Sequence, residues 1–246
     1  DGIDRILAAP EYGRGIHIQN VEFYNAQHKG TAIYLKSTST SSAGYIYGVN
    51  IDNVRIHRFE YGIRIHVVNT EDVTNWINGN LFTDIWGYST TNFIHLKSEG
   101  VGTLNTDGNV FRGIDFQRGF QSTVPTIVIS GRYNVIEQCM IWDWEQTSPK
   151  AFVFSAGSHH NHASVITGSW SQLKCENLGD TTNTFSFEGG KLYGKYHIIG
   201  SVSGLYGNTI TVGSSGCQYT TLLAAIHGTN TSDASSTNRY IFEIYG

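Results

Sequence analysis

Proline, methionine and charged residues are scarce in this sequence of 246 residues. It contains 3 Pro and 1 Met, and only 15% of its residues are charged. The charges nearly balance, with 16 Lys and Arg against 20 Asp and Glu. Because there is no basic tract, we expect no nucleic-acid partner. Because no apolar run reaches the length of about 18 residues that a membrane-spanning helix needs, we expect no membrane insertion.

Cysteine is too sparse for a disulfide framework or a metal centre. Cys139, Cys175 and Cys217 are widely separated, whereas metal sites use closely spaced ligands. We expect three free and mostly buried thiols. The run HHNH at 159–162 has no carboxylate pattern beside it, so it is expected to be a polar turn. The prediction is therefore that the protein binds no metal and needs no cofactor.

The residues that are abundant favour β-structure. Gly numbers 28, Tyr 14 and Phe 12, and β-branched residues are also plentiful, while helix formers are few. A chain of this length can bury a substantial core. The composition therefore predicts an all-β protein.

A short motif of alternating apolar and polar residues recurs along the chain, with starts 25 to 33 residues apart. Its copies are IQNVEF (18–23), IDNVRI (51–56), FTDIWG (82–87), FRGIDF (111–116), IEQCMI (136–141) and ITGSWS (166–171). Each is followed by a second alternation, namely IYL (33–35), IRI (63–65), IHL (94–96), IVI (127–129), FVF (152–154) or FSF (185–187). Such a period is typical of a β-solenoid, whereas a propeller blade needs a longer unit.

The third position of the motif predicts a sharp corner between two sheets. It is mostly occupied by residues that tolerate left-handed backbone angles. The residues at this position are Asn20, Asn53, Asp84, Gly113, Gln138 and Gly168, with Gln138 as the exception.

The repeat resembles the right-handed parallel β-helices of the pectate-lyase-like type, especially those of bacteriophage tailspikes and polysaccharide depolymerases. The resemblance covers residues 15–190 and rests on the pattern rather than on a single motif. It implies a homotrimer on the virion tail, outside the cell. The expected partner is a bacterial surface polysaccharide, such as a capsule, an exopolysaccharide or an O-antigen.

After Gly190 the rhythm changes. Four further strands with polar turns are expected, in GKYHIIGSV, NTITVGSS, YTTLLAAIHG and NRYIFEIYG. They look like the small β-sandwich that tailspikes often carry after their helix. The predicted organisation is a right-handed parallel β-helix over residues 1–190 and a C-terminal β-sandwich-like module over residues 191–246.

Strand side chains alternate, so the fifth and seventh positions of each motif are expected to point outward. The fifth-position column is Glu22, Arg55, Trp86, Asp115, Met140 and Trp170. The seventh-position column is Tyr24, His57, Tyr88, Gln117, Trp142 and Gln172. Aromatic rings stack on the apolar faces of sugars, and the predicted substrate-binding residues are Trp86, Tyr88, Trp142, Trp144, Trp170, Arg55 and His57. The same rings could instead lie in a subunit interface, where Trp and Tyr are also enriched.

Hydrolysis of a glycoside needs two carboxyl groups at a defined separation. Asp115 is expected to lie between Trp86 and Met140, whose apolar surface could raise its pKa toward acid catalysis. Asp143 and Glu145, on the next turn, are its predicted catalytic partners. The simpler alternative is that Asp115 pairs with a nearby cation such as Arg118.

Two other functions stay open. A polysaccharide lyase needs a cation and a base, which Arg55 and His57 could supply. A non-catalytic adhesin or a structural trimeric shaft would use the same fold without cleaving anything.

The second sheet has an outward column of its own. It is Tyr34, Arg64, His95, Val128, Val153 and Ser186, followed two residues later by Lys36, His66, Lys97, Ser130, Ser155 and Glu188. The basic early turns could meet an acidic polysaccharide or form a solvated face.

Overall fold

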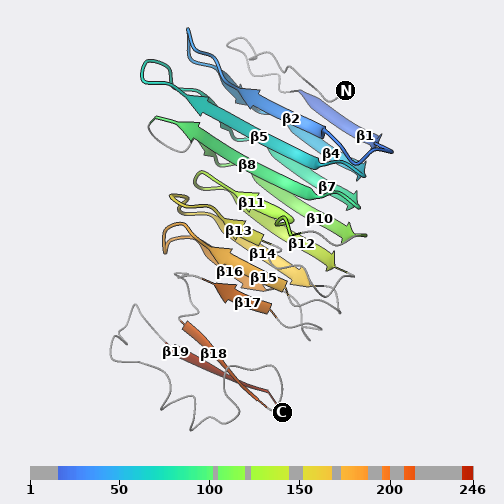
Figure 1. Cartoon of the computed structure of the whole chain (residues 1–246), viewed down its shortest axis with the longest axis vertical. Helices are drawn as coiled ribbons and strands as arrows, with labels where there is room; N and C mark the ends of the chain where they lie inside the picture. The colour runs from blue at the N-terminus through green and yellow to red at the C-terminus, as the bar shows by residue number, and fades with distance from the viewer. Residues whose placement is uncertain are drawn as a thin grey trace. The chain divides into compact units, whose positions relative to one another are not determined.

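The computed structural model describes residues 16–101, 105–119, 123–143, 152–167, 173–187, 196–199, 208–213 and 240–245. The chain divides into two compact units, Asp1–Gly200 and Ser201–Gly246. The first is a parallel β-solenoid, in which strands from successive turns stack on one another (Figure 1).

Three parallel sheets form the walls of the solenoid. The first sheet contains β1 (His17–Tyr24), β4 (Asn50–His57), β7 (Leu81–Tyr88), β10 (Val110–Arg118), β12 (Val135–Asp143), β14 (His162–Thr167) and β16 (Thr184–Phe187). The second contains β2 (Thr31–Ser37), β5 (Tyr61–Asn69), β8 (Asn92–Gly100), β11 (Ile127–Ile129), β13 (Phe152–Phe154), β15 (Leu173–Asn177) and β17 (Tyr196–Ile199). The third contains β3 (Tyr45–Tyr47), β6 (Trp76–Asn78) and β9 (Thr106–Asp107).

The register of the first sheet confirms five of the six predicted motif copies. Ile18, Ile51, Phe82, Phe111 and Ile136 are direct neighbours on successive strands. The parallel β-helix that the repeat predicted is therefore the fold of this unit, while its right-handedness stays a prediction.

The sixth copy was placed wrongly. Met140 pairs with Ile166, where the motif alignment expected Trp170. The cause is a register shift after Ile136, because β14 lacks the extra residue that forms the bend in β12. Likewise FSF at 185–187 lies in β16 of the first sheet, and Glu176 takes the place beside Val153 that was expected for Ser186.

The predicted corner is confirmed by the backbone. Asn20, Asn53, Asp84, Gly113 and Gln138 all have positive φ, between 48° and 66°. Gln138 adopts the same angle although glutamine does not favour it. The stacking of the turns therefore imposes the bend. Gly168 lies outside the described residues.

Apolar side chains from all three sheets fill the interior. Aromatic rings stack from turn to turn, with ring centroids 4.6 Å apart for Phe82 and Phe111 and for Phe93 and Phe116. A side chain at Gly87 would bring a Cβ within 2.2 Å of the ring of Phe93. The glycine therefore makes room for the ring of Phe93. That ring fills the space which larger side chains occupy at the same position of neighbouring strands.

A column of buried asparagines precedes the strands of the first sheet. Its members are Asn80, Asn109, Asn134, Asn161 and Asn183, each at most 1% exposed. The backbone N–H of each of the first four donates to the side-chain oxygen of the asparagine on the next turn, at 2.9–3.3 Å. The ladder satisfies backbone groups that the turn would otherwise leave buried without a partner.

The solenoid runs past the boundary expected at residue 190. β17, expected to begin the C-terminal module, pairs in parallel with β15 and so extends the second sheet. In the second unit, β18 (Asn208–Gly213) and β19 (Tyr240–Tyr245) form a parallel pair. The rest of the expected β-sandwich lies outside the described residues. Cys139 and Cys175 are free and buried, as expected, while Cys217 falls outside the described ranges.

Candidate functional site

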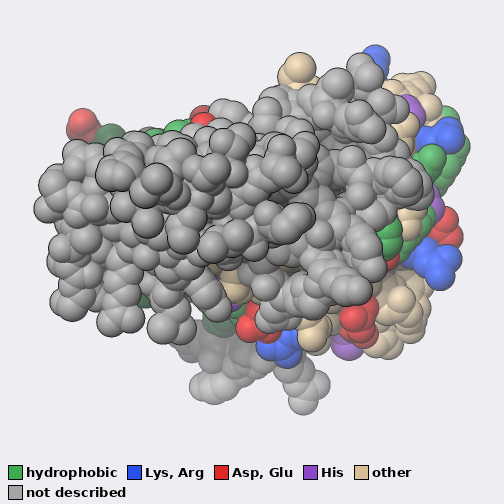
Figure 2. All heavy atoms as spheres, turned by 90° about the horizontal axis from the view of Figure 1, so that it is seen from below, with side chains coloured by type: hydrophobic (Ala, Val, Ile, Leu, Met, Phe, Trp, Pro, Cys, Tyr) green, Lys and Arg blue, Asp and Glu red, His purple; other side chains and the backbone are tan. Residues whose placement is uncertain are grey.

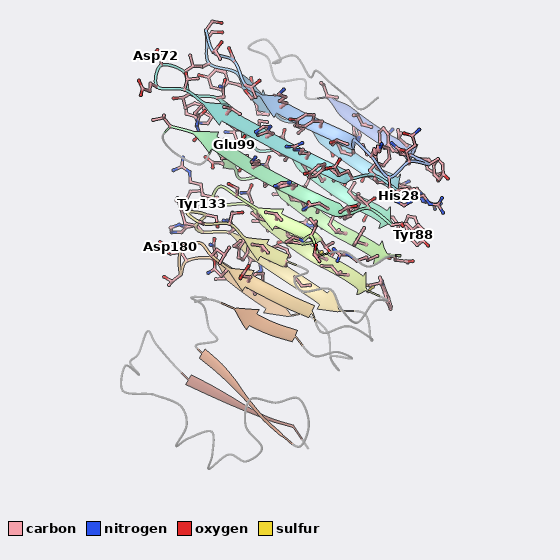
Figure 3. All side chains as sticks on the ribbon, viewed as in Figure 1. His28, Asp72, Tyr88, Glu99, Tyr133 and Asp180 are labelled. Carbon is pink, nitrogen blue, oxygen red and sulfur yellow. The ribbon has the colours of Figure 1, made fainter. Side chains whose placement is uncertain are left out.

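The outward face of the first sheet brings six of the predicted site residues together. Glu22, Arg55, Trp86, Asp115 and Met140 are register neighbours on β1, β4, β7, β10 and β12. The column two residues further along is Tyr24, His57, Tyr88, Gln117 and Trp142. Tyr88 and His28 lie at the edge of the solenoid where the first-sheet strands end (Figure 3).

Aromatic rings form a continuous cluster on this face. The ring centroids of His57 and Trp86 are 5.0 Å apart, and those of Trp86 and Tyr88 are 6.2 Å apart with nearly parallel planes. Beside this aromatic cluster, a depression is lined by Asn53, Arg55 and Trp86. Flat, partly exposed rings next to a hollow are an arrangement that suits a sugar.

His57 lies beside an acidic neighbour, Glu22. Its Nε2 lies 3.1 Å from Oε1 of Glu22, outside good hydrogen-bond geometry, and its side chain is only 18% exposed. The imidazole thus lies between the carboxylate of Glu22 and the ring of Trp86.

Asp115 occupies the position that the sequence predicted, between Trp86 and Met140. Burial raises the pKa of its carboxyl group, and the indole N–H of Trp142 offsets part of that shift. Neither Asp115 Oδ1 nor Trp142 Nε1 makes a hydrogen bond of good geometry. The carboxyl group is therefore poised to hold a proton more readily than an exposed aspartate.

The side chain of Arg118 points into the solenoid. It is fully buried, and one guanidinium nitrogen donates to the carbonyl of Val124 and to Oγ1 of Thr126. The cation named as a simpler partner for Asp115 is thus engaged in the interior.

The predicted catalytic partners of Asp115 are not tested by the structure. The backbone of Asp143 lies opposite Arg118 at the end of β12, but its side chain falls outside the described residues. So do Glu145, Trp144 and Trp170.

The bend presents a second carboxylate that sequence reasoning read only as a corner residue. Asp84 is exposed, and its Oδ1 lies over Gly113, two residues before Asp115 on the next strand. Strand spacing and rise put the Cα atoms of Asp84 and Asp115 about 8 Å apart. Asp84 belongs to the column of residues with left-handed backbone angles, and the bend there turns its side chain outward. That column was the feature of the sequence that could have revealed it.

Metal and membrane features can be addressed only within the described ranges. There, no group of three or more His, Cys, Asp and Glu side chains is placed to hold a metal ion. Nor does any helix in those ranges have the length and apolar character to span a membrane.

Comparison with known protein families, curated proteins and solved structures found no match to this chain. The fold assignment therefore rests on the geometry of the strands themselves.

Proposed function

We propose that the outward face of the first sheet binds a polysaccharide and that Asp115 acts as the general acid in its hydrolysis. The observation that carries this proposal is the half-buried Asp115, with its raised pKa, beside the aromatic cluster. A carboxyl group that keeps its proton can donate it to a glycosidic oxygen.

The shape of the face suits a polymer. The five strands from β1 to β12 span about 19 Å across the sheet, enough for several sugar units. Rings of Trp86, Tyr88 and His57 offer stacking surfaces along that line, and Arg55 offers donors to hydroxyl or acidic groups.

Asp84 is the described residue best placed to be the second carboxyl group. Its Cα atom lies about 8 Å from that of Asp115 by strand geometry. A separation of about 6.5–9.5 Å between the two carboxyl groups would leave room for an attacking water and give inversion. Asp143 and Glu145 remain predicted alternatives for the same role.

We also propose the biological setting that the repeat pattern implies. The substrate would be a bacterial surface polysaccharide, and the protein would act as a homotrimer on a virion tail. Support comes from the parallel β-solenoid, a fold compatible with polysaccharide binding or degradation.

Replacing Trp86 by alanine tests the binding face. We expect Trp86→Ala to lower affinity for the cognate polysaccharide about tenfold, equivalent to about 1.4 kcal/mol, because a stacking surface is lost. Trp76→Ala, which removes an indole from the third sheet, is the matched control and should bind normally. Calorimetric titration measures both variants, and sedimentation reports their oligomeric state. Unchanged affinity together with dissociation of the trimer would instead assign Trp86 to a subunit interface.

A further inference from the structure

The outward face of the second sheet carries a hydrogen-bonded network across β2, β5 and β8. The hydroxyl of Tyr34 lies 3.0 Å from Nδ1 of His66, and Nε2 of His66 lies 2.6 Å from Oε2 of Glu99. The other oxygen of Glu99 is 2.5 Å from Nζ of Lys97. Glu99, labelled on β8 in Figure 3, is thus already occupied by two partners.

Arg64, in the middle of this face, is held by rings rather than by an acid. Its guanidinium carbon lies 5.3 Å from the ring centre of Tyr34 and 4.6 Å from that of Tyr61. Within the described part of the chain it makes no ion pair, and its Nε is buried without a hydrogen-bond acceptor. A planar cation fixed between two rings presents its donors with little further loss of side-chain entropy.

The groups around Arg64 leave the face positive. Lys36, over the ring of Tyr34, and Lys97 add two positive charges, against one negative charge on Glu99. His95, the register neighbour of Arg64, stacks on Tyr61 at 5.4 Å. Burial, then the charges of Arg64 and Lys97, lower the pKa of His95 to about 4, so its ring is neutral at pH 7. His66 also has a lowered pKa, chiefly through burial.

Two other arginines in the described ranges are paired with acids, Arg112 with Glu137 and Arg132 with Asp107. Figure 2 shows acidic and basic side chains interspersed on the described part of the face it presents. On the second sheet the one carboxylate in the network is neutralised, whereas Arg64 lacks a counter-charge within the described ranges.

We propose that Arg64 binds the carboxylate of an acidic sugar on the outward face of β2, β5 and β8. A guanidinium fork matches a carboxylate through two parallel hydrogen bonds, which an ammonium group cannot reproduce. The rings of Tyr34 and Tyr61 supply flat surface beside it, and the neutral imidazole of His95 can exchange a hydrogen bond with a sugar hydroxyl. This site shares no residue with the proposed hydrolytic site.

Binding of glucuronic acid oligosaccharides tests the proposal, with their methyl esters as the uncharged counterparts. We expect the acid to bind and the ester to bind at least tenfold more weakly. Arg64→Met should lower affinity for the acid at least tenfold, and Arg64→Lys should restore only part of it. The matched control is Arg132→Met, which removes the same charge from an arginine paired with Asp107; it should bind as the wild type does.

Three outcomes would overturn this assignment. They are equal affinity for acid and ester, equal loss in Arg64→Met and Arg132→Met, and no binding of the acid to the wild type. Trp86→Ala separates the two proposals, because it should leave binding of the acid unchanged. If Trp86→Ala abolishes that binding and Arg64→Met does not, the acid binds the first sheet and the Arg64 site fails, while the proposed function stands.

Discussion

At the scale of single residues, Asp115 decides whether the first sheet is catalytic. The Asp115→Asn variant keeps the shape of the side chain and removes its titratable proton, so we expect cleavage to be lost. Wild-type activity should fall as pH rises through the raised pKa of Asp115, because only the protonated form is an acid. Product formation measured across pH for both proteins tests this.

The Asp115→Asn substitution also has a predicted effect on thermal stability. Because the folded state raises the pKa of Asp115, the stability associated with its bound proton is fully present below the ordinary value of 3.8 and is lost as pH rises from there through the raised pKa. Asp115→Asn should therefore unfold at the same temperature as the wild type at pH 7, or slightly higher.

Asp72→Asn, on the loop after β5 in Figure 3, makes the same chemical change away from the site and should keep full activity. Full activity in Asp115→Asn would remove Asp115 from the mechanism.

At the scale of structural elements, the buried asparagines should contribute strongly to stability. Asn134 donates from its backbone and side chain to Asn161, and its amide also bonds Thr106 O at 2.7 Å. Asn134→Ala would leave several buried polar groups without partners, each costing about 1–3 kcal/mol. We expect a loss of about 2–4 kcal/mol in the free energy of unfolding, measured by urea titration.

Asn50 provides the matched comparison for that experiment. Its Oδ1 is buried without a partner, so Asn50→Ala removes the same group without breaking a bond to that oxygen. We expect a change of under about 1 kcal/mol. Equal losses in the two variants would mean that the ladder bonds contribute little.

Much of the solenoid could be read from the sequence because its turns repeat the same physical requirement. Apolar positions recur at Ile51, Phe82, Phe111 and Ile136, since stacked strands must bury the same face. The sixth turn was misread because β14 omits the bend residue and Ala163 supplies a weak apolar signal. Because β14 has one residue fewer at the bend, every later residue on it shifts by one position relative to β12. The sequence pattern does not reveal this shift until the strand pairing is known.

The candidate site was predicted only in part, for related reasons. Alternation correctly placed Trp86 and Asp115 side by side, because it follows from strand geometry. The outward turn of Asp84 depends on a left-handed bend, and the capture of Arg64 by two rings depends on packing across strands. The asparagine ladder did leave a signal, since each member stands two residues before a first-sheet apolar position such as Phe111 or Ile136.

At the scale of the whole molecule, the first unit is a parallel β-solenoid with two different outward faces. The first sheet combines aromatic rings with a carboxyl group of raised pKa. The second combines rings with an arginine that lacks a counter-charge within the described ranges. Under the two proposals, a polysaccharide that carries acidic sugars would contact both faces.

The most direct test of the central claim is to incubate the purified protein with a panel of bacterial surface polysaccharides and to weigh the soluble products by mass spectrometry. The account predicts oligosaccharides whose masses include one added water per cleaved bond, and their absence with Asp115→Asn. Products lighter by one water, absorbing in the ultraviolet, would contradict hydrolysis and point to a lyase acting through Arg55 and His57. Binding without any fragments would contradict catalysis and leave a non-catalytic adhesin.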